Sequence, residues 1–248
     1  MTTNLWTILL ASSLTAIVTG LGALPFLFFK RFSSWWLGIF QAATAGLMLG
    51  ASHNLIQEGV HLSPYRTFVG ILVGLTLIVL ADRFISSRAD VDLGELVGAD
   101  ARKALLILGI MTVHSFAEGI GVGVSFGGGQ KLGLFITVAI AIHNIPEGLA
   151  VAMVMVPKGT KPWKAGLWGI FTSLPQPLMA IPAFLFVILF EPWLPVGLGL
   201  AAGAMIWMVF AELIPEAYER GPSGAAIGIA VTLAFAALLA FQEFVLVF

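Results

Sequence analysis

Long apolar runs fill most of the chain, and short charged or Gly/Pro-rich stretches separate them. Eight of these runs are long enough to cross a bilayer as a helix, which needs roughly 20 predominantly apolar residues. They lack the regular alternation over about ten residues that is typical of a membrane β-strand. The pattern predicts an all-α membrane protein with eight transmembrane helices, approximately at residues 5–29, 33–57, 66–83, 103–126, 132–156, 163–190, 193–215 and 223–246.

Composition strengthens this prediction. Hydrophobic residues make up 59% of the 248 positions and charged residues 10%, whereas ordinary soluble domains are about 45–50% apolar and about 25% charged. We therefore expect one multi-pass transmembrane domain over residues 1–248. The chain has no cysteine, which excludes disulfides and thiolate metal ligands. A net charge of −1 gives no reason to expect a nucleic-acid partner.

The placement of basic residues predicts the orientation, because lysine and arginine favour the cytoplasmic side of a membrane. If the N-terminus lies outside, the outer connections contain only Arg66 and Lys131. The inner connections then contain Lys30, Arg31, Arg83, Arg88, Arg102, Lys103, Lys158, Lys161, Lys164 and Arg220. This bias predicts that both termini lie outside (N-out/C-out).

The longest polar segment is residues 84–102, between the third and fourth predicted helices. It shows no apolar periodicity, and we therefore expect a flexible inner loop. This loop divides the chain into three helices and five helices.

One motif occurs twice. The stretches HSFAEGIGVGV from His114 and HNIPEGLAVAM from His143 share the pattern H-x-x-x-E-G. They lie on consecutive predicted helices, which must run in opposite directions. Inverted repeats are typical of transporters, whose binding sites lie at the repeat interface near the bilayer midplane.

The repeated motif places ionisable groups deep in the membrane. Residues four apart share a helix face, so His114 points with Glu118, and His143 with Glu147. Such groups are costly in a bilayer unless they are paired, hydrated or bound to metal. Imidazole and carboxylate ligands together suit Zn²⁺, Fe²⁺ and Mn²⁺. The alternative is a structural hydrogen-bond network with protonated glutamates, but two inverted copies favour a metal site.

The sixth predicted helix adds a polar group at this depth, Gln176 in the stretch TSLPQPLMAIP. Prolines 175, 177 and 182 lack amide donors and release backbone carbonyls there, and Pro146 does the same in the fifth helix. Released carbonyls at membrane depth are typical of helices that line a cavity. A simple packing kink is the alternative for each proline.

Two further polar clusters lie nearer the helix ends. His53 and Glu58 lie toward the outer end of the second helix, and Glu212 and Glu216 toward the inner end of the seventh. We interpret them as stations on a path to and from the central site. The alternative is interfacial side chains that reach water. Small-residue patterns at Gly70-x-x-x-Gly74 and Gly224-x-x-x-Gly228 predict close helix packing or a dimer face.

These motifs resemble a known family. HNIPEG, HSFAEG and AELIPEA are similar to motifs of the ZIP (Zrt/Irt-like) divalent metal transporters, and the resemblance covers nearly the whole chain. It implies a 3+2+3 bundle with an inverted central pair, often a homodimer. It also implies that His114, Glu118, His143 and Glu147 form the primary metal site and that Asn144 belongs to an adjacent second site.

The sequence departs from the family pattern at three positions. Ser115 stands where asparagine is usual, and Gln176 stands where many members have glutamate. A neutral amide does not offset the charge of a second dication, so we expect one well-formed site and a weaker or absent second one. Ala117 replaces the proline that would match Pro146, so the fourth helix is expected to be less unwound.

The resulting hypothesis is transport of Zn²⁺, and by the resemblance also Fe²⁺, Mn²⁺ or Cd²⁺, toward the cytoplasm by alternating access. The expected location is a plasma membrane or a bacterial inner membrane, and no cofactor is expected beyond the transported ion. An intramembrane metal-dependent hydrolase is the alternative, in which the metal activates water. The chain has no H-E-x-x-H motif, and a hydrolase has little use for an inverted duplicate of its site.

Overall fold

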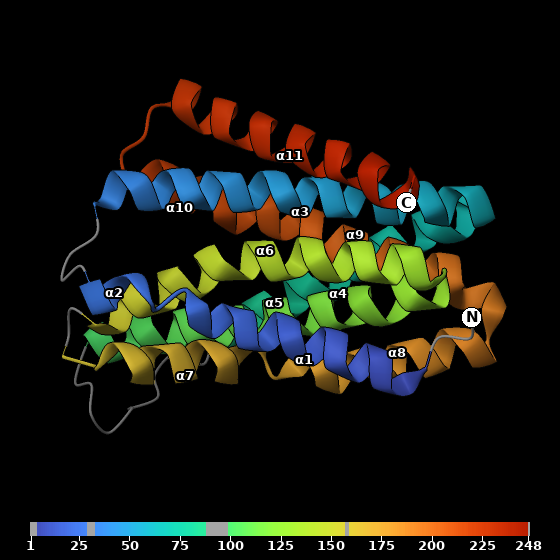
Figure 1. The fold of residues 1–248 in the computed structure, drawn as a ribbon, viewed down its shortest axis with the longest axis horizontal. Helices are drawn as coiled ribbons and strands as arrows, with labels where there is room; N and C mark the ends of the chain where they lie inside the picture. Colours follow the sequence, from blue (N-terminus) through green and yellow to red (C-terminus); the bar gives the residue numbers. More distant parts are fainter. Residues whose placement is uncertain (1–3, 29–32, 88–98, 157–158, 248) are drawn as a thin grey trace.

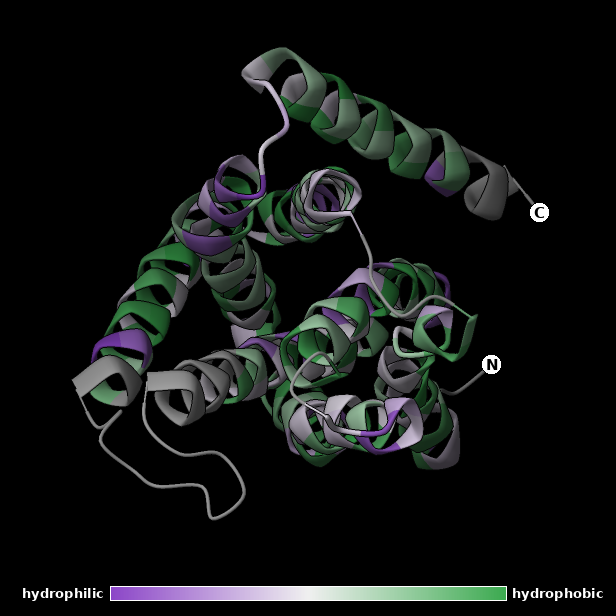
Figure 2. Ribbon diagram, turned by 90° about the vertical axis from the view of Figure 1, so that its left-hand side faces the viewer, coloured by the Kyte–Doolittle hydropathy of each residue, from purple (hydrophilic) through white to green (hydrophobic). Residues whose placement is uncertain are grey.

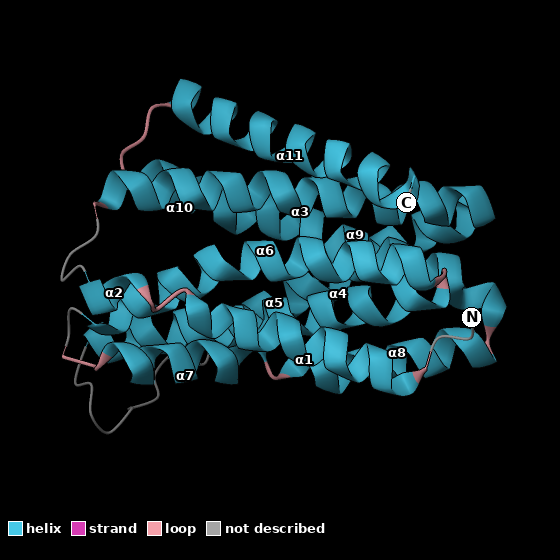
Figure 3. Cartoon of the chain, viewed as in Figure 1, coloured by secondary structure: helices cyan, strands magenta, loops and turns pink. Residues whose placement is uncertain are grey.

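The computed structural model describes residues 4–28, 33–87, 99–156 and 159–247, and these residues form helices without β-strands (Figure 3). Figure 1 shows the helices running roughly along one common axis. They are α1 (Leu5–Leu21), α2 (Pro25–Phe28), α3 (Ser34–Leu62), α4 (Pro64–Ser87), α5 (Ala99–Gly127), α6 (Gln130–Met155), α7 (Pro162–Ser173), α8 (Pro175–Leu189), the 3-10 helix η2 (Glu191–Trp193), α9 (Leu194–Met208), the π-helix η3 (Val209–Leu213), α10 (Ile214–Glu219) and α11 (Gly224–Val247).

Six helical segments are long and apolar enough to cross a membrane, which confirms an all-α membrane protein. They are Leu5–Phe28, Pro64–Phe84, Gln130–Met155, Pro162–Leu189, Leu194–Glu219 and Gly224–Gln242. The two remaining long helices, α3 and α5, have 29 residues each and are not among the six. The predicted count of eight spans and their orientation therefore stay predictions.

Several helix ends differ from the predicted ranges. α3 continues to Leu62, five residues beyond the predicted end, so His61 lies in a helix and not in a loop. α4 continues to Ser87 and α5 begins at Ala99, which makes the loop predicted at 84–102 shorter at both ends. Its central residues 88–98 lie outside the described residues, as do Lys30, Arg31 and Lys158 of the charge count.

Two predicted spans are divided where a new helix begins with proline, whereas another proline leaves its span intact. The span predicted at 5–29 is divided after Leu21, and α2 begins at Pro25. The span predicted at 163–190 is divided at Leu174, because Pro175 supplies no amide donor and begins a new helix, α8. Pro146, in contrast, lies inside α6, which continues without interruption to Met155. The span predicted at 193–215 is extended to Glu219 and contains the π-helix η3, a type of local bulge often found at functional sites.

The Gly70-x-x-x-Gly74 pattern packs inside the chain and does not form a dimer face. A Cβ atom at Gly70 or Gly74 would overlap the backbone of α9, and one at Gly199 or Gly203 would overlap α4. Small residues on both helices therefore allow α4 and α9 to pack closely. Gly228 of the second pattern, in contrast, is open, because a Cβ atom there would have no described atom of a neighbouring helix within 4 Å.

Helix α11 lies at the edge of the bundle and packs mainly against α3 (Figure 1). Figure 2 shows apolar residues along most of its length. Large side chains such as Ile229 and Leu233 are more than half exposed, which suits contact with lipid. Among the six candidate spans, α6 is the most buried, with 67% of its most apolar window buried.

Glycines of the repeated motif set the packing around α5 and α6. A Cβ at Gly119 would lie 2.6 Å from the carbonyl oxygen of Gln176, and one at Gly148 would overlap the carbonyl oxygen of Thr19. The glycine after each motif glutamate therefore lets a neighbouring helix approach, α8 beside α5 and α1 beside α6. This close approach brings polar side chains of α1 and α8 to the motif glutamates.

Candidate metal centre

Three side chains of the repeated motif converge at the centre of the bundle. Glu118 on α5 and His143 and Glu147 on α6 each offer one ligand atom, and these atoms all lie within 4.8 Å of one another. We call these three residues the central group. Their exposed fractions are 0%, 0% and 2%. The i, i+4 spacing places His143 and Glu147 on one face of α6. Glu118 reaches them from α5, which packs against α6.

The central group contains one formed contact and two open ligand atoms. Nε2 of His143 lies 2.7 Å from Oε1 of Glu118. Nδ1 of His143 and Oε1 of Glu147 are buried without a hydrogen-bond partner among the described residues. Buried polar atoms are costly when they are unsatisfied. One imidazole and two carboxylates form the mixed nitrogen and oxygen ligand set that Zn²⁺ and similar ions prefer.

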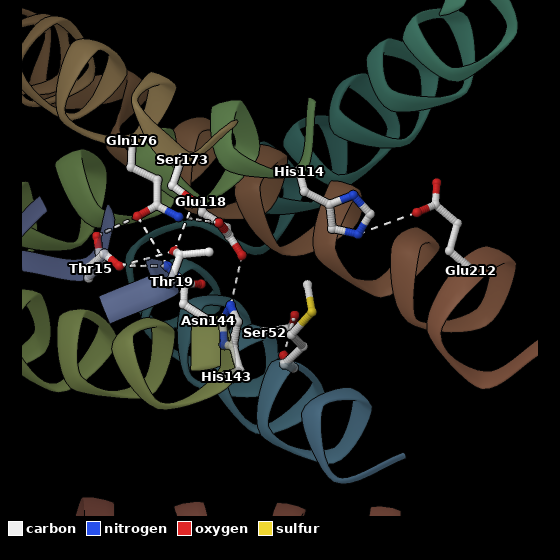
Figure 4. Close-up of polar contacts among 11 residues, drawn as sticks. Thr15, Thr19, Ser52, His114, Glu118, His143, Asn144, Ser173, Gln176 and Glu212 are labelled. Carbon is white, nitrogen blue, oxygen red and sulfur yellow. Dashed lines mark hydrogen bonds and ion pairs between the residues drawn. The ribbon is translucent and has the colours of Figure 1, made fainter. Parts of the chain in front are cut away.

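His114 does not join the central group in this structure. Its Nε2 atom lies 3.4 Å from Oε2 of Glu212, which belongs to the π-helix η3. Figure 4 shows its ring turned toward Glu212 and away from Glu118. The sequence predicted that His114, Glu118, His143 and Glu147 surround one ion. The structure brings the last three together, whereas His114 contacts Glu212, one of the two predicted inner residues. The role of each as a metal ligand stays a prediction.

Gln176 lies beside the central group at the start of α8. Its Nε2 donates to Oε2 of Glu118 at 2.5 Å. Its Oε1 accepts from the hydroxyl of Thr15 at 2.5 Å and from Nδ2 of Asn144 at 3.3 Å. Nδ2 of Asn144 also donates to the carbonyl oxygen of Thr15 at 3.0 Å, and Oδ1 of Asn144 is buried without a partner. Figure 4 shows these side chains gathered on one side of Glu118.

The sequence pattern did not indicate the buried hydroxyls near Gln176, which belong to Thr15, Thr19 and Ser173. Thr15 and Thr19 on α1 are buried, and the Thr19 and Ser173 hydroxyls lie 2.8 Å apart. The spacing of four residues between the two threonines was the available signal, since it puts them on one face. The signal is weak, because serine and threonine in helices commonly bond to a carbonyl of their own helix. Ser115, the other predicted second-site position, is buried beside His114.

The two predicted outer residues lie apart on α3. The ring of His53 is exposed and makes an edge contact with Phe235 of α11, with centroids 6.2 Å apart. Glu58 is partly buried, and its Cγ lies 3.8 Å from the position of a Cβ at Gly128, at the connection of α5 and α6. Five residues of helix turn the two side chains to different sides, so the structure does not bring them into one station.

The two predicted inner glutamates also have different partners. Glu216 forms an ion pair with Arg220, and it accepts a hydrogen bond from Nε2 of Gln41 at 2.5 Å. Glu212 is 20% exposed and faces His114. The repulsion expected between the two carboxylates is offset by these partners, and only Glu212 is directed at a residue of the repeated motif.

Comparisons with known proteins identify similar chains. A family model described as ZIP Zinc transporter matches residues 85–241. A candidate zinc transporter of Arabidopsis thaliana is 48% identical over 232 residues, which cover 92% of this chain but only 37% of that protein. The zinc transporter GufA of Myxococcus xanthus is 34% identical over 86% of this chain and 89% of its own. The zinc transporter ZIPB of Bordetella bronchiseptica is 33% identical over 82% and 70%.

Proposed function

The chain belongs to the ZIP zinc transporter family, and on that premise we propose that it carries divalent transition-metal ions across a membrane through the central group. Zinc is the proposed main cargo, because the relatives are named as zinc transporters. Iron, manganese and cadmium are further candidates, because the same nitrogen and oxygen ligands accept them.

The observation that carries this proposal is the buried cluster of Glu118, His143 and Glu147. Two carboxylates offset the charge of one dication inside a bundle that excludes water. The ligand set contains no thiolate, since the chain has no cysteine. The ion is therefore bound by exchangeable ligands, as a transport site requires.

The proposed topology has eight spans with both termini outside. It adds α3 and α5 to the six apolar segments, since each has 29 residues, enough for about 43 Å of helix. Figure 1 supports an even number of crossings, because α1 begins and α11 ends at the same end of the bundle. The excess of lysine and arginine in the predicted inner connections supports the orientation.

The proposed route runs by alternating access toward the cytoplasm. Glu58 and His53 are the proposed outer residues, and Glu212 and Glu216 the proposed inner ones. His114 is the proposed link between the central group and Glu212. It lies on the same face of α5 as Glu118, and its ring contacts Glu212 in this structure. We propose that His114 turns toward the central group when the ion is bound and toward Glu212 when the ion leaves.

A flux measurement tests the function. Purified protein in proteoliposomes with a trapped zinc-sensitive dye is expected to admit Zn²⁺. The double variant His143→Ala with Glu147→Ala should lose that flux, because it removes two of the three central ligands. A matched control removes the same two residue types at exposed positions, His61→Ala with Glu219→Ala, and should keep it. Unchanged flux in the central double variant would show that the assignment is wrong.

The same preparation tests the cargo and any coupling to protons. A panel of divalent metals with an independently varied pH gradient identifies the preferred ion and any coupling to protons. Hydrolysis of a lipid or peptide without metal flux would instead favour the hydrolase alternative, which no contact among the described residues supports. The proposed location is a plasma membrane or a bacterial inner membrane, and the proposed partner is a second copy of the chain.

A further inference from the structure

The two carboxylate oxygens of Glu118 face two different environments. Oε1 lies on the side of His143 and belongs to the central group, at 2.7 Å from Nε2 of that ring. Oε2 accepts a hydrogen bond of 2.5 Å from Nε2 of Gln176. A carboxylate in such a position could hold a cation on each side. The second side of Glu118 is already occupied by a neutral amide.

The orientation of this amide is determined by its neighbours. Oε1 of Gln176 accepts from Nδ2 of Asn144 on α6 and shares the single hydroxyl proton of Thr15 on α1 with the carbonyl oxygen of Ser12, 2.7 Å from that hydroxyl, which leaves the amino group to face Glu118. The reversed amide would place its oxygen against a carboxylate oxygen and its amino group against that of Asn144. Thr15 and Gln176 are both fully buried, so water does not compete for these bonds.

Charge also argues against a second ion at this position. The two carboxylates of the central group balance one dication, and a second dication would bring two positive charges with no further carboxylate beside Gln176 among the residues that the structure describes. The ion would also have to displace a buried hydrogen bond to a charged group, which is among the stronger kinds. The amide of Gln176 therefore stabilises Glu118 in the way a second cation would, without adding charge.

We propose that Thr15 holds Gln176 as a neutral substitute for a second cation, so that the buried site binds one divalent ion per chain. This inference rests on the proposed function and deepens it. Thr15 is a positioning residue, since it contacts Gln176 and the backbone and acts on Glu118 only through that amide. Gln176 determines the number of ions bound.

The number of ions bound tests the proposal directly. Full-length protein in detergent is equilibrated with Zn²⁺, and bound metal is counted relative to the His143→Ala with Glu147→Ala variant, which serves as the blank. Wild-type protein should bind one Zn²⁺ above the blank, and Gln176→Glu should bind two. Two ions in the wild type, or one in Gln176→Glu, would overturn the inference. No ion above the blank in the wild type would instead overturn the proposed function.

A threonine series tests the positioning role without adding charge. Thr15→Val removes the hydroxyl at nearly constant volume and loosens Gln176, the hydrogen-bond partner of Glu118. The Zn²⁺ dissociation constant should increase by up to about tenfold, the lower end of the effect of losing a direct partner of a metal ligand. Thr15→Ser retains the hydroxyl and should bind like the wild type. Thr19→Val is the matched control, because its hydroxyl contacts Ser173 and not Gln176. Equal affinities for Thr15→Val and Thr19→Val would overturn the role of Thr15.

Discussion

Nε2 of His143 lies 2.7 Å from Oε1 of Glu118, and this contact joins α6 to α5 at the centre of the bundle. It connects the two copies of the repeated motif, one residue from each. The contact satisfies one atom of each side chain, whereas Oε1 of Glu147 has no hydrogen-bond partner in the part of the chain that the structure describes. The two glutamates of the central group therefore differ in what they contribute to the stability of the ion-free protein.

Replacing each glutamate by methionine should separate binding from stability. Glu118→Met leaves the partner atoms of His143 and Gln176 buried and unpaired, at a cost of about 1–3 kcal/mol each in the free energy of unfolding. Glu147→Met removes an unsatisfied oxygen at similar volume and should leave that free energy unchanged or higher. Both variants should lose Zn²⁺ binding. The free energy of unfolding is measured in detergent without metal, and zinc binding is measured at equilibrium. Equal destabilisation by both variants would contradict the proposal that Glu118 and Glu147 contribute differently to stability.

Acid should weaken zinc binding. Neutral imidazole and ionised carboxylates bind the metal, and their protonated forms do not, so the metal competes with protons. The dissociation constant of Zn²⁺ should increase as pH falls from about 8 to about 5, the range in which histidine changes charge. The increase is about tenfold per pH unit for each proton that the metal displaces. Titration of binding at several pH values checks this, and a constant affinity across the range would contradict ligation by His143.

Alanine at the two motif glycines should destabilise the bundle. Cβ atoms at Gly119 and Gly148 would meet the backbone at Gln176 and Thr19, and overpacking of this kind typically costs about 1–3 kcal/mol. Thermal unfolding in detergent measures the loss. Gly228→Ala is the matched control, because its Cβ would meet open space, and it should unfold like the wild type. If Gly228→Ala lowered the stability as much as Gly148→Ala, the loss would not be due to close helix packing at Gly148.

The contact between His114 and Glu212 should show measurable coupling. His114 is 2% exposed and Glu212 20%, and partners in direct contact typically couple by about 0.5–3 kcal/mol. A double-mutant cycle with His114→Gln and Glu212→Gln, measured by unfolding, gives this value. The more exposed pair Glu216 and Arg220 is the comparison, with a coupling of about 0.3–0.5 kcal/mol expected for an i, i+4 ion pair. Additive effects at His114 and Glu212 would argue against the contact.

Local spacing predicted which side chains of one helix share a face, and their role as metal ligands stays a prediction. His143 and Glu147 are four positions apart, which places both on one helix face, and the structure brings them together with Glu118. Apolar run lengths predicted a membrane protein and most helix ranges within a few residues. The effect of proline was less predictable: Pro175 ends a helix and Pro146 does not. Both prolines lack an amide donor, so the local sequence does not distinguish the two outcomes.

The repeated motif determined by itself that a histidine and a glutamate share a face on each of two consecutive helices, since that follows from helical periodicity alone. Only the tertiary structure decided that His114 turns to Glu212 while Glu118 meets His143, and that Thr15 reaches Gln176. These pairings join residues 98, 25 and 161 positions apart. They depend on which helices approach most closely. Backbone contacts at Gly119 and Gly148 bring α8 to α5 and α1 to α6, and periodicity along one helix does not reveal such contacts.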